Sequence, residues 1–137
     1  MDKELKKKLK EMHICIHCQR PLPEGYEQES CLSCKRILKR AAAGGGWRWK
    51  LTVQILDHYG WVCRCCGERE PMFLTLDHSQ GGGNLDRSEI RKEKHDWYKQ
   101  VIDAGFPEDL QILCYNCNLG KSRNGGICPH KEGGTNV

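Results

Sequence analysis

The chain has 137 residues, of which 38% are hydrophobic and 29% charged; it carries ten cysteines and a formal net charge of +4. A chain of this length forms one compact domain or two very small ones, and so few apolar residues build only a thin core. No apolar stretch approaches the roughly 18 residues of a transmembrane helix, and the N-terminus lacks the apolar centre of a signal peptide. We therefore expect a cytoplasmic protein, because paired cysteines in a reducing compartment bind metal ions and do not form disulfides.

The positive charge is concentrated in the first half of the chain. Residues 1–60 contain 12 Lys and Arg against 7 Asp and Glu, whereas residues 61–137 contain 10 against 11. This asymmetry predicts a polyanion-binding module in the first half, with an ordinary soluble surface as the alternative.

Three helices are predicted in the first half, at Asp2–Met12, Lys35–Ala43 and Arg48–Tyr59. The glycines 44–46 end the second helix, because consecutive glycines disfavour helical backbone. Apolar side chains recur at the spacing of one helix face in the third helix, and Gly60 is placed to end it.

The second half is predicted to contain two strands and two helices. The strands are Met72–Leu76 and Leu110–Leu113. A helix is expected at Arg87–Ala104, with Asp86 as its N-cap, and a short helix from Asn118 to about Arg123. The tail, residues 124–137, is glycine-rich and is expected to be loose except at Cys128-Pro129-His130.

Eight cysteines form four C-x-x-C pairs, and these predict two structural zinc ions. Cys15, Cys18, Cys31 and Cys34 form the first set, with twelve residues between its two pairs. Two such turns supply the four thiolates that tetrahedral Zn²⁺ prefers. Cys63, Cys66, Cys114 and Cys117 form the second set across a gap of 47 residues (67–113), where zinc would clamp the ends of a strand hairpin.

Further cysteines and histidines have no assigned role. Cys65 is interpreted as a spare thiol. Cys128 and His130 could close a third metal site, cap a zinc site or only hold the tail in place, and we favour the last interpretation. His95 is interpreted as a surface histidine, with a phosphate contact as the alternative, and His13 and His17 as bystanders of the first zinc set.

Asp77-His78 and Asn118 form the candidate reactive group. If zinc clamps the hairpin to the last helix, Asn118 lies beside the end of the first strand. Asp77 and Asn118 then offer oxygen ligands that suit Mg²⁺ or Mn²⁺, and His78 can remove a proton from water. A second Leu-Asp-His triplet, residues 56–58, lies on a predicted helix and is interpreted as structural.

Four motifs follow one another in the second half of the chain. They are C-x2-C-G at Cys63–Gly67, L-x-L-D-H at Leu74–His78, the glycines 81–83, and L-x-I-L-C-x-N-C-N-x-x-K at Leu110–Lys121. In this combination they resemble the HNH nucleases with a ββα-metal core. With its N-terminal cysteines the chain resembles the small zinc-ribbon HNH endonucleases common in phages, some of which nick DNA at specific sites.

The resemblance implies an enzyme that hydrolyses DNA phosphodiester bonds and leaves a 5′ phosphate and a 3′ hydroxyl. It implies His78 as general base, Asp77 and Asn118 as ligands of a catalytic Mg²⁺ or Mn²⁺, and zinc at the second cysteine set. Asp109 stands where the family has an asparagine that braces the histidine loop. Because a carboxylate cannot donate an amide N–H, we expect Asp109 to be a brace and not a ligand.

Double-stranded DNA is the expected partner, and the first half of the chain is expected to bind it. Six basic residues lie within sixteen positions, interleaved with tryptophans: Lys35, Arg36, Lys39, Arg40, Arg48 and Lys50, with Trp47 nearer the DNA and Trp49 in the core. Basic side chains neutralise phosphates, and tryptophan can stack on bases or wedge between them. Lys121 and Arg123 are further candidates for phosphate contacts, with solvated charge at a helix end as the alternative.

The sequence thus predicts a small zinc-stabilised α+β protein. Residues 1–46 would form a zinc ribbon with a basic helical arm, and residues 47–137 an HNH domain with a ββα-metal core. The alternatives are a non-catalytic double-zinc DNA-binding accessory protein and a zinc-scaffold adaptor; the latter leaves Asp77, His78 and Asn118 unexplained. A monomer would nick DNA and a homodimer would cut both strands. The resemblance also implies an origin in a phage of a bacterial host and no membrane partner.

Overall fold

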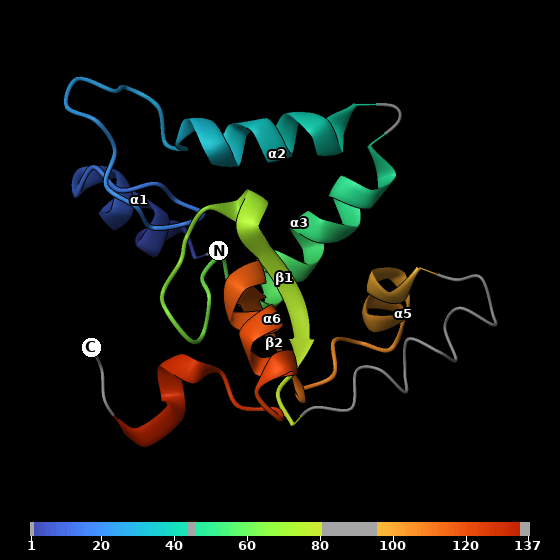
Figure 1. The fold of residues 1–137 in the computed structure, drawn as a ribbon. Coiled ribbons are helices and arrows are strands. Elements are labelled where there is room, and N and C mark those ends of the chain that lie inside the picture. Colours follow the sequence, from blue (N-terminus) through green and yellow to red (C-terminus); the bar gives the residue numbers. More distant parts are fainter. Residues whose placement is uncertain (1, 44–45, 81–95, 135–137) are drawn as a thin grey trace.

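The structure is a computed structural model that describes residues 2–43, 46–80 and 96–134. Its elements are, in order, α1 (Lys3–Glu11), α2 (Leu32–Ala42), α3 (Trp47–Tyr59), the 3-10 helix η1 (Pro71–Phe73), β1 (Leu74–His78), α5 (Trp97–Asp103), β2 (Leu110–Cys114), α6 (Tyr115–Arg123) and the 3-10 helix η2 (Pro129–Gly134) (Figure 1). It is a small α+β protein, and its described strands form a two-stranded antiparallel sheet. Among the described residues, no helix combines the length and the apolar character needed to cross a membrane.

The helices of the first half form close to where their sequences predict them. Asp2 caps α1 by accepting a hydrogen bond from the backbone N–H of Glu4 at 3.2 Å. Helix α2 begins at Leu32, three residues before the predicted start at Lys35. Cys31 is its N-cap residue, so Cys34 of the first cysteine set lies in the first helical turn.

Helix α3 ends as predicted at Tyr59, and Gly60 follows it with a backbone φ of 109°. A residue with a side chain rarely adopts this φ, so glycine suits the position. The helix buries Ile55 and Leu56 in the core. The Tyr59 hydroxyl donates a 2.6 Å hydrogen bond to the carbonyl of Pro107, tying α3 to the segment before β2.

Strand β1 lies two residues further along the chain than predicted, so Asp77 and His78 belong to the strand and do not follow it. Pro71 begins the 3-10 turn η1, and the Glu70 side chain accepts from the Met72 N–H, which keeps residues 71–73 out of the sheet. Asp77 then pairs with Gln111, and His78 pairs with Leu110. The pairing of β1 with β2 therefore extends β1 as far as His78.

Helix α5 flanks the outer edge of β1. The backbone N–H of Leu76 donates a 3.2 Å hydrogen bond to the Tyr98 hydroxyl. Burial raises the pKa of Tyr98 above its ordinary value, so the phenol stays protonated. Asp96 caps the helix through the Tyr98 N–H, so α5 begins at Trp97. The predicted N-cap at Asp86, the first part of the predicted helix, the glycines 81–83 and His95 lie outside the described residues.

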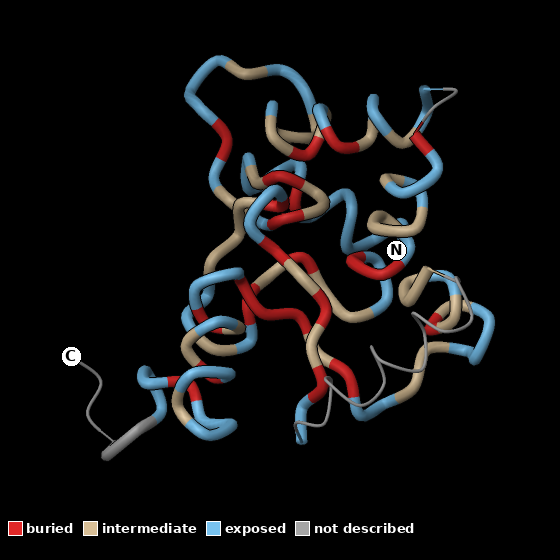
Figure 2. Tube along the Cα trace, turned by 45° about the vertical axis from the view of Figure 1, so that its right-hand side comes forward, coloured by how far each residue is buried: buried red, intermediate tan, exposed pale blue. Residues whose placement is uncertain are grey.

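The buried apolar side chains form one cluster that draws on both halves of the chain. Ile37 comes from α2, Ile55 and Leu56 from α3, and Leu76 and Ile112 from the two strands. Figure 2 shows how buried positions run through the hairpin and along the inward faces of the helices. Six of the eight cysteines of the two sets are buried in this cluster, Cys31 packs against it and Cys66 is exposed, so metal ions bound at these sets would stabilise the same structure as the apolar packing.

The proposed boundary between residues 46 and 47 runs between two helices that pack on each other, α2 and α3. Polar contacts also join the two halves. Arg69 donates a 2.7 Å hydrogen bond to the carbonyl of Cys18, and Arg20 forms an ion pair with Glu70 at 3.3 Å. The division into two domains stays a prediction; the described parts of both share one core.

The described part of the tail, residues 124–134, is more ordered than its glycine content predicts. Helix α6 ends at Arg123, and Gly125 and Gly126 then reverse the chain with φ values of 65° and 96°. Cys128 is buried, and the 3-10 helix η2 follows it. The returning segment packs against α6.

Candidate functional site

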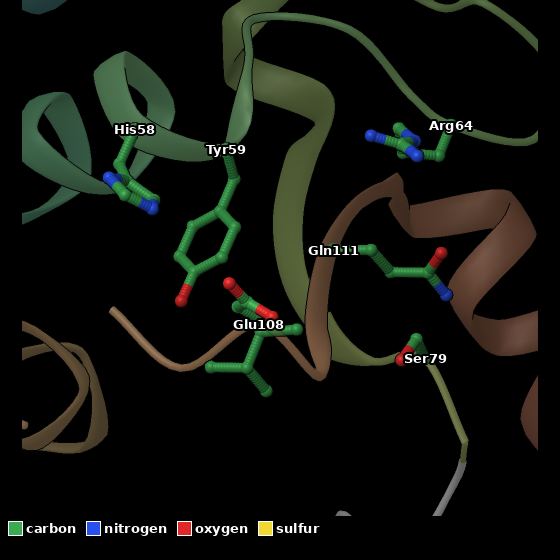
Figure 3. A pocket seen from close by; sticks show the side chains of 7 residues that line it. His58, Tyr59, Arg64, Ser79, Glu108 and Gln111 are labelled. Carbon is green, nitrogen blue, oxygen red and sulfur yellow. The ribbon is translucent and has the colours of Figure 1, made fainter. Parts of the chain in front are cut away.

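An open pocket of about 300 Å³ lies at the end of α3 (Figure 3). His58 and Tyr59 line it, together with Glu108 and Gln111 from the β2 side. His58 stacks on Phe106, with ring centroids 4.2 Å apart, and the preceding Asp57 accepts a 2.9 Å hydrogen bond from the Trp61 indole. The second Leu-Asp-His triplet therefore makes structural contacts at a helix end.

The first cysteine set is assembled as the sequence predicts. The sulfur atoms of Cys15, Cys18, Cys31 and Cys34 all lie within 4.8 Å of one another. The Sγ atoms of Cys18 and Cys31 are 3.7 Å apart. Two Zn–S bonds of about 2.3 Å at a tetrahedral angle separate their sulfurs by about 3.8 Å, so this set fits zinc.

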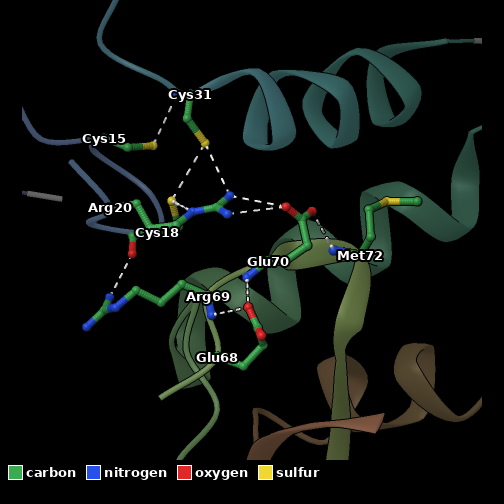
Figure 4. Close-up of polar contacts among 8 residues, drawn as sticks. All are labelled: Cys15, Cys18, Arg20, Cys31, Glu68, Arg69, Glu70 and Met72. Carbon is green, nitrogen blue, oxygen red and sulfur yellow. Dashed lines mark hydrogen bonds and ion pairs between the residues drawn. The ribbon is translucent and has the colours of Figure 1, made fainter. Parts of the chain in front are cut away.

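Arg20 lies beside the first set and links it to the second half of the chain (Figure 4). Its Nε donates to Cys18 Sγ at 3.3 Å, and its guanidinium also contacts Glu70. Burial acts to lower the pKa of Arg20, but the thiolates of Cys18 and Cys31 outweigh it and raise the pKa above its ordinary value. The permanent positive charge stabilises the thiolate form that zinc requires.

The first pair of each set has the same backbone turn. The Cys15 N–H donates to the carbonyl of Arg20 at 2.9 Å, and the Cys63 N–H donates to the carbonyl of Glu68 at 2.8 Å. Each turn contains a residue with positive φ, Gln19 at 57° and Gly67 at 80°. Both turns therefore direct two sulfurs toward one point, although glycine occupies the special position in the second turn only.

The second cysteine set is assembled across the sequence gap. The sulfurs of Cys63, Cys66, Cys114 and Cys117 also lie within 4.8 Å of one another, and those of Cys66 and Cys114 are 3.7 Å apart. Burial opposes ionisation of Cys63, but backbone N–H groups of Cys66 and Cys114 hydrogen-bond to its sulfur and lower its pKa to about 7. The two four-cysteine clusters could thus hold structural metal ions such as zinc.

A third group of ligands is present, which the sequence raises as an alternative for Cys128 and His130 but does not favour, and to which it assigns neither Cys65 nor Cys117. Cys65, Cys128 and His130 gather around Cys117, which also belongs to the second set. The signal in the sequence was three unassigned ligand residues. Nothing in the local sequence shows that the tail returns to α6. The sequence therefore favours a spare thiol at Cys65 and residues that only hold the tail in place at Cys128 and His130.

Asp77 faces α6. Its Oδ2 is 2.6 Å from the ammonium of Lys121 and accepts a 3.1 Å hydrogen bond from Gln111. The Lys121 ammonium also donates to the carbonyl of His78. The side chains of Lys121 and Asp77 are 10% and 15% exposed, so Lys121 is an internal ion-pair partner and not the exposed phosphate contact that the sequence predicts. Arg123 is exposed as expected.

His78 faces the opposite side of the hairpin from Asp77, because successive residues of a strand point to opposite faces. Its ring stacks on Trp97 of α5, with centroids 5.1 Å apart and planes 10° apart. The residue is buried. The stacking limits the orientations that the imidazole can adopt.

Asn118 and Asp109 are the remaining predicted site residues: Asn118 lies in α6, and Asp109 directly precedes β2. Asn118 is half-buried in α6, three residues before Lys121, and residues at that spacing share a helix face. Asn118 is therefore on the side of α6 that faces Asp77. Asp109 braces the chain after His78, but through its backbone: its carbonyl accepts hydrogen bonds from the Ser79 N–H at 2.8 Å and the Ser79 hydroxyl at 2.9 Å. The side chain of Asp109 is exposed.

The basic residues of the first half lie mainly on the surface of α2 and α3. Exposed members are Arg36, Lys39, Arg40, Arg48 and Lys50, and Lys35 is half-buried over the Tyr26 ring. Trp47 is 51% exposed with Arg48 over its ring, whereas Trp49 packs on the core with Arg40 over its outer side. Residues 31–50 contain no Asp or Glu, so this segment is positively charged, although Arg48 forms an ion pair of 3.9 Å with Asp96 at the start of α5.

Comparison of the chain with family models, with curated proteins and with solved structures finds no match. The functional conclusion therefore depends on the residues and contacts described above.

Proposed function

We propose that this protein is a metal-dependent DNA endonuclease of the HNH type. The main support is the relation between Asp77 and α6. An antiparallel hairpin leads directly into α6, a cysteine pair lies at that junction, and Asp77 contacts Lys121 on the helix face that carries Asn118. This order of strand, strand and helix is what a ββα-metal core requires.

Asp77 and Asn118 are the proposed ligands of the catalytic ion. Their carboxylate and amide oxygens are ligands that Mg²⁺ and Mn²⁺ accept. The Lys121 ammonium occupies Oδ2 of Asp77 in the structure, so the ion would have to displace this ammonium to bind there. When bound, the ion would stabilise negative charge that develops on the phosphate and the leaving oxygen.

His78 is the proposed general base. Its imidazole would accept a proton from the water that attacks the phosphorus, and the Trp97 ring would hold its plane during that step. Cleavage would leave a 5′ phosphate and a 3′ hydroxyl. The exposed arginines and lysines of α2 and α3 would bind the phosphates of double-stranded DNA, with Trp47 available for stacking.

A non-catalytic DNA-binding protein is the second candidate, and two observations favour it. Lys121 already neutralises the Asp77 carboxylate, and the ring of His78 lies on the other face of the strand. The same zinc sets and basic surface would then serve binding alone.

Cleavage of supercoiled plasmid in the presence of Mg²⁺ or Mn²⁺ distinguishes the two candidates. We expect conversion to open-circle DNA, or to linear DNA if two subunits act together. His78→Ala should lower the rate by about 10²- to 10⁴-fold, the usual contribution of a general base, with little change in DNA affinity. His58→Ala is the matched control, because His58 belongs to the other Leu-Asp-His triplet, and it should cleave normally.

Tight DNA binding by the unaltered protein with no cleavage under either metal would reject the nuclease proposal and identify a binding protein. Unchanged cleavage by His78→Ala would reject His78 as the general base.

A further inference from the structure

The third ligand group lies where the tail meets α6. Cys65 comes from the turn of the second cysteine set, Cys117 from α6, and Cys128 and His130 from the returning tail. Each offers one ligand atom, and the four atoms lie within 4.8 Å of one another. The group shares Cys117 with the second set.

The distances within this group match a tetrahedral zinc site. His130 Nδ1 is 3.8 Å from Cys65 Sγ, 3.4 Å from Cys117 Sγ and 3.6 Å from Cys128 Sγ. A Zn–S bond of about 2.3 Å and a Zn–N bond of about 2.0–2.1 Å at a tetrahedral angle separate sulfur and nitrogen by about 3.6 Å. The mean of the three observed distances has the same value.

The fold holds the tail in this position by close packing. Gly120 of α6 lies against Pro129: a Cβ at residue 120 would be 3.1 Å from Pro129 Cδ, closer than ordinary van der Waals contact. Glycine at 120 therefore permits the approach that brings Cys128 and His130 to Cys117. The turn that precedes Cys128 is closed by a hydrogen bond from Asn124 Nδ2 to the carbonyl of Ile127 at 3.0 Å.

We infer that the second half of the chain binds two zinc ions in one cluster, with the Cys117 thiolate bridging them. One ion takes Cys63, Cys66, Cys114 and Cys117; the other takes Cys65, Cys117, Cys128 and His130. Each ion is then four-coordinate, as structural zinc requires. Six thiolates and two Zn²⁺ carry a formal charge of −2, the same as one Zn²⁺ with four thiolates, so the second ion adds no net charge to the site.

The cluster accounts for the three ligands that sequence reasoning left without a role. It also adds a third ion per chain to the two predicted from the C-x-x-C pairs. The inference is independent of whether the protein cleaves DNA, because it concerns only the metal content and its ligands.

Counting the metal tests the inference. We expect native mass spectrometry and elemental analysis of the full chain, at a free zinc concentration that fills both four-cysteine sets, to give three zinc ions. The double variant Cys128→Ser/His130→Ala should bind two, because only Cys65 and the shared Cys117 remain at the third site. His58→Ala is the control histidine and should retain three. Two ions in the unaltered protein, or three in the double variant, would overturn the inference.

Cadmium substitution tests the bridge itself. Two ¹¹³Cd nuclei that share one thiolate show scalar coupling through the sulfur, whereas separate sites do not. We expect three ¹¹³Cd resonances, two of them mutually coupled, and loss of one resonance and of the coupling in the double variant. Three uncoupled resonances would refute the bridging role of Cys117.

Discussion

Two Lys–Asp ion pairs in this protein have nearly the same length but differ in burial, which allows a controlled prediction. Lys121 lies 2.6 Å from Asp77 with side chains 10% and 15% exposed, and Lys99 lies 2.7 Å from Asp103 with side chains 59% and 60% exposed. The first pair links α6 to β1, and the second lies within α5. Replacing each lysine by methionine removes the charge but keeps most of the side-chain volume.

The expected costs differ by about an order of magnitude. Lys121→Met leaves the Asp77 carboxylate buried without its cation, and breaking a buried pair in this way costs about 3–5 kcal/mol of unfolding free energy. Lys99→Met breaks a solvated pair at i,i+4 spacing, which is worth about 0.3–0.5 kcal/mol. At about 3 °C per kcal/mol for a chain of this size, Tm should fall by about 10–15 °C and about 1 °C respectively.

Thermal melting of both variants in the same zinc buffer measures this difference. Adding Asp77→Asn to Lys121→Met removes the uncompensated charge, so the double variant should be more stable than Lys121→Met alone. Equal losses from Lys121→Met and Lys99→Met, or a double variant less stable than that single variant, would refute the burial of the Asp77–Lys121 pair.

Two further predictions concern the basic surface and a zinc turn. Replacing Arg36, Lys39 and Arg40 with alanine should flatten the log–log salt dependence of DNA binding by about 2–3 units, because each phosphate contact contributes about 0.9; an unchanged slope in filter-binding titrations would place the contacts elsewhere. Gly67→Ala should cost about 1–2 kcal/mol in denaturant unfolding, because φ is 80° there and no atom lies within 4 Å of the added Cβ. A much larger loss would show that the methyl group disturbs the zinc turn itself.

Much of the local structure follows from local patterns. Each C-x-x-C turn is built from neighbouring residues, so the sequence predicts the four turns from local pattern. The meeting of Cys63 and Cys66 with Cys114 and Cys117 depends in addition on the pairing of the two strands between them. The ends of α3 follow from short-range signals as well, since glycines flank it and apolar residues mark its buried face. The α+β class could be predicted from the expected helices and strands, and a thin core beside cysteine clusters that could bind metal from composition and cysteine spacing.

The tertiary structure decided which groups from distant parts of the chain meet. Pairing with Leu110 and Gln111 extends β1 through His78, and so turns the side chains of Asp77 and His78 to opposite faces. The sequence shows Lys121 as a charge near a helix end, but packing of α6 against the hairpin buries it beside Asp77.

The tail is the clearest case in which the sequence did not predict a contact between distant residues. Its composition predicts a loose segment, because glycine-rich sequence has little preference of its own for ordered backbone. Contact between Pro129 and Gly120, which no local pattern encodes, brings Cys128 and His130 to Cys117 and Cys65. The sequence alone determined which residues could bind metal, whereas the packing of the tail on α6 decided that these four meet.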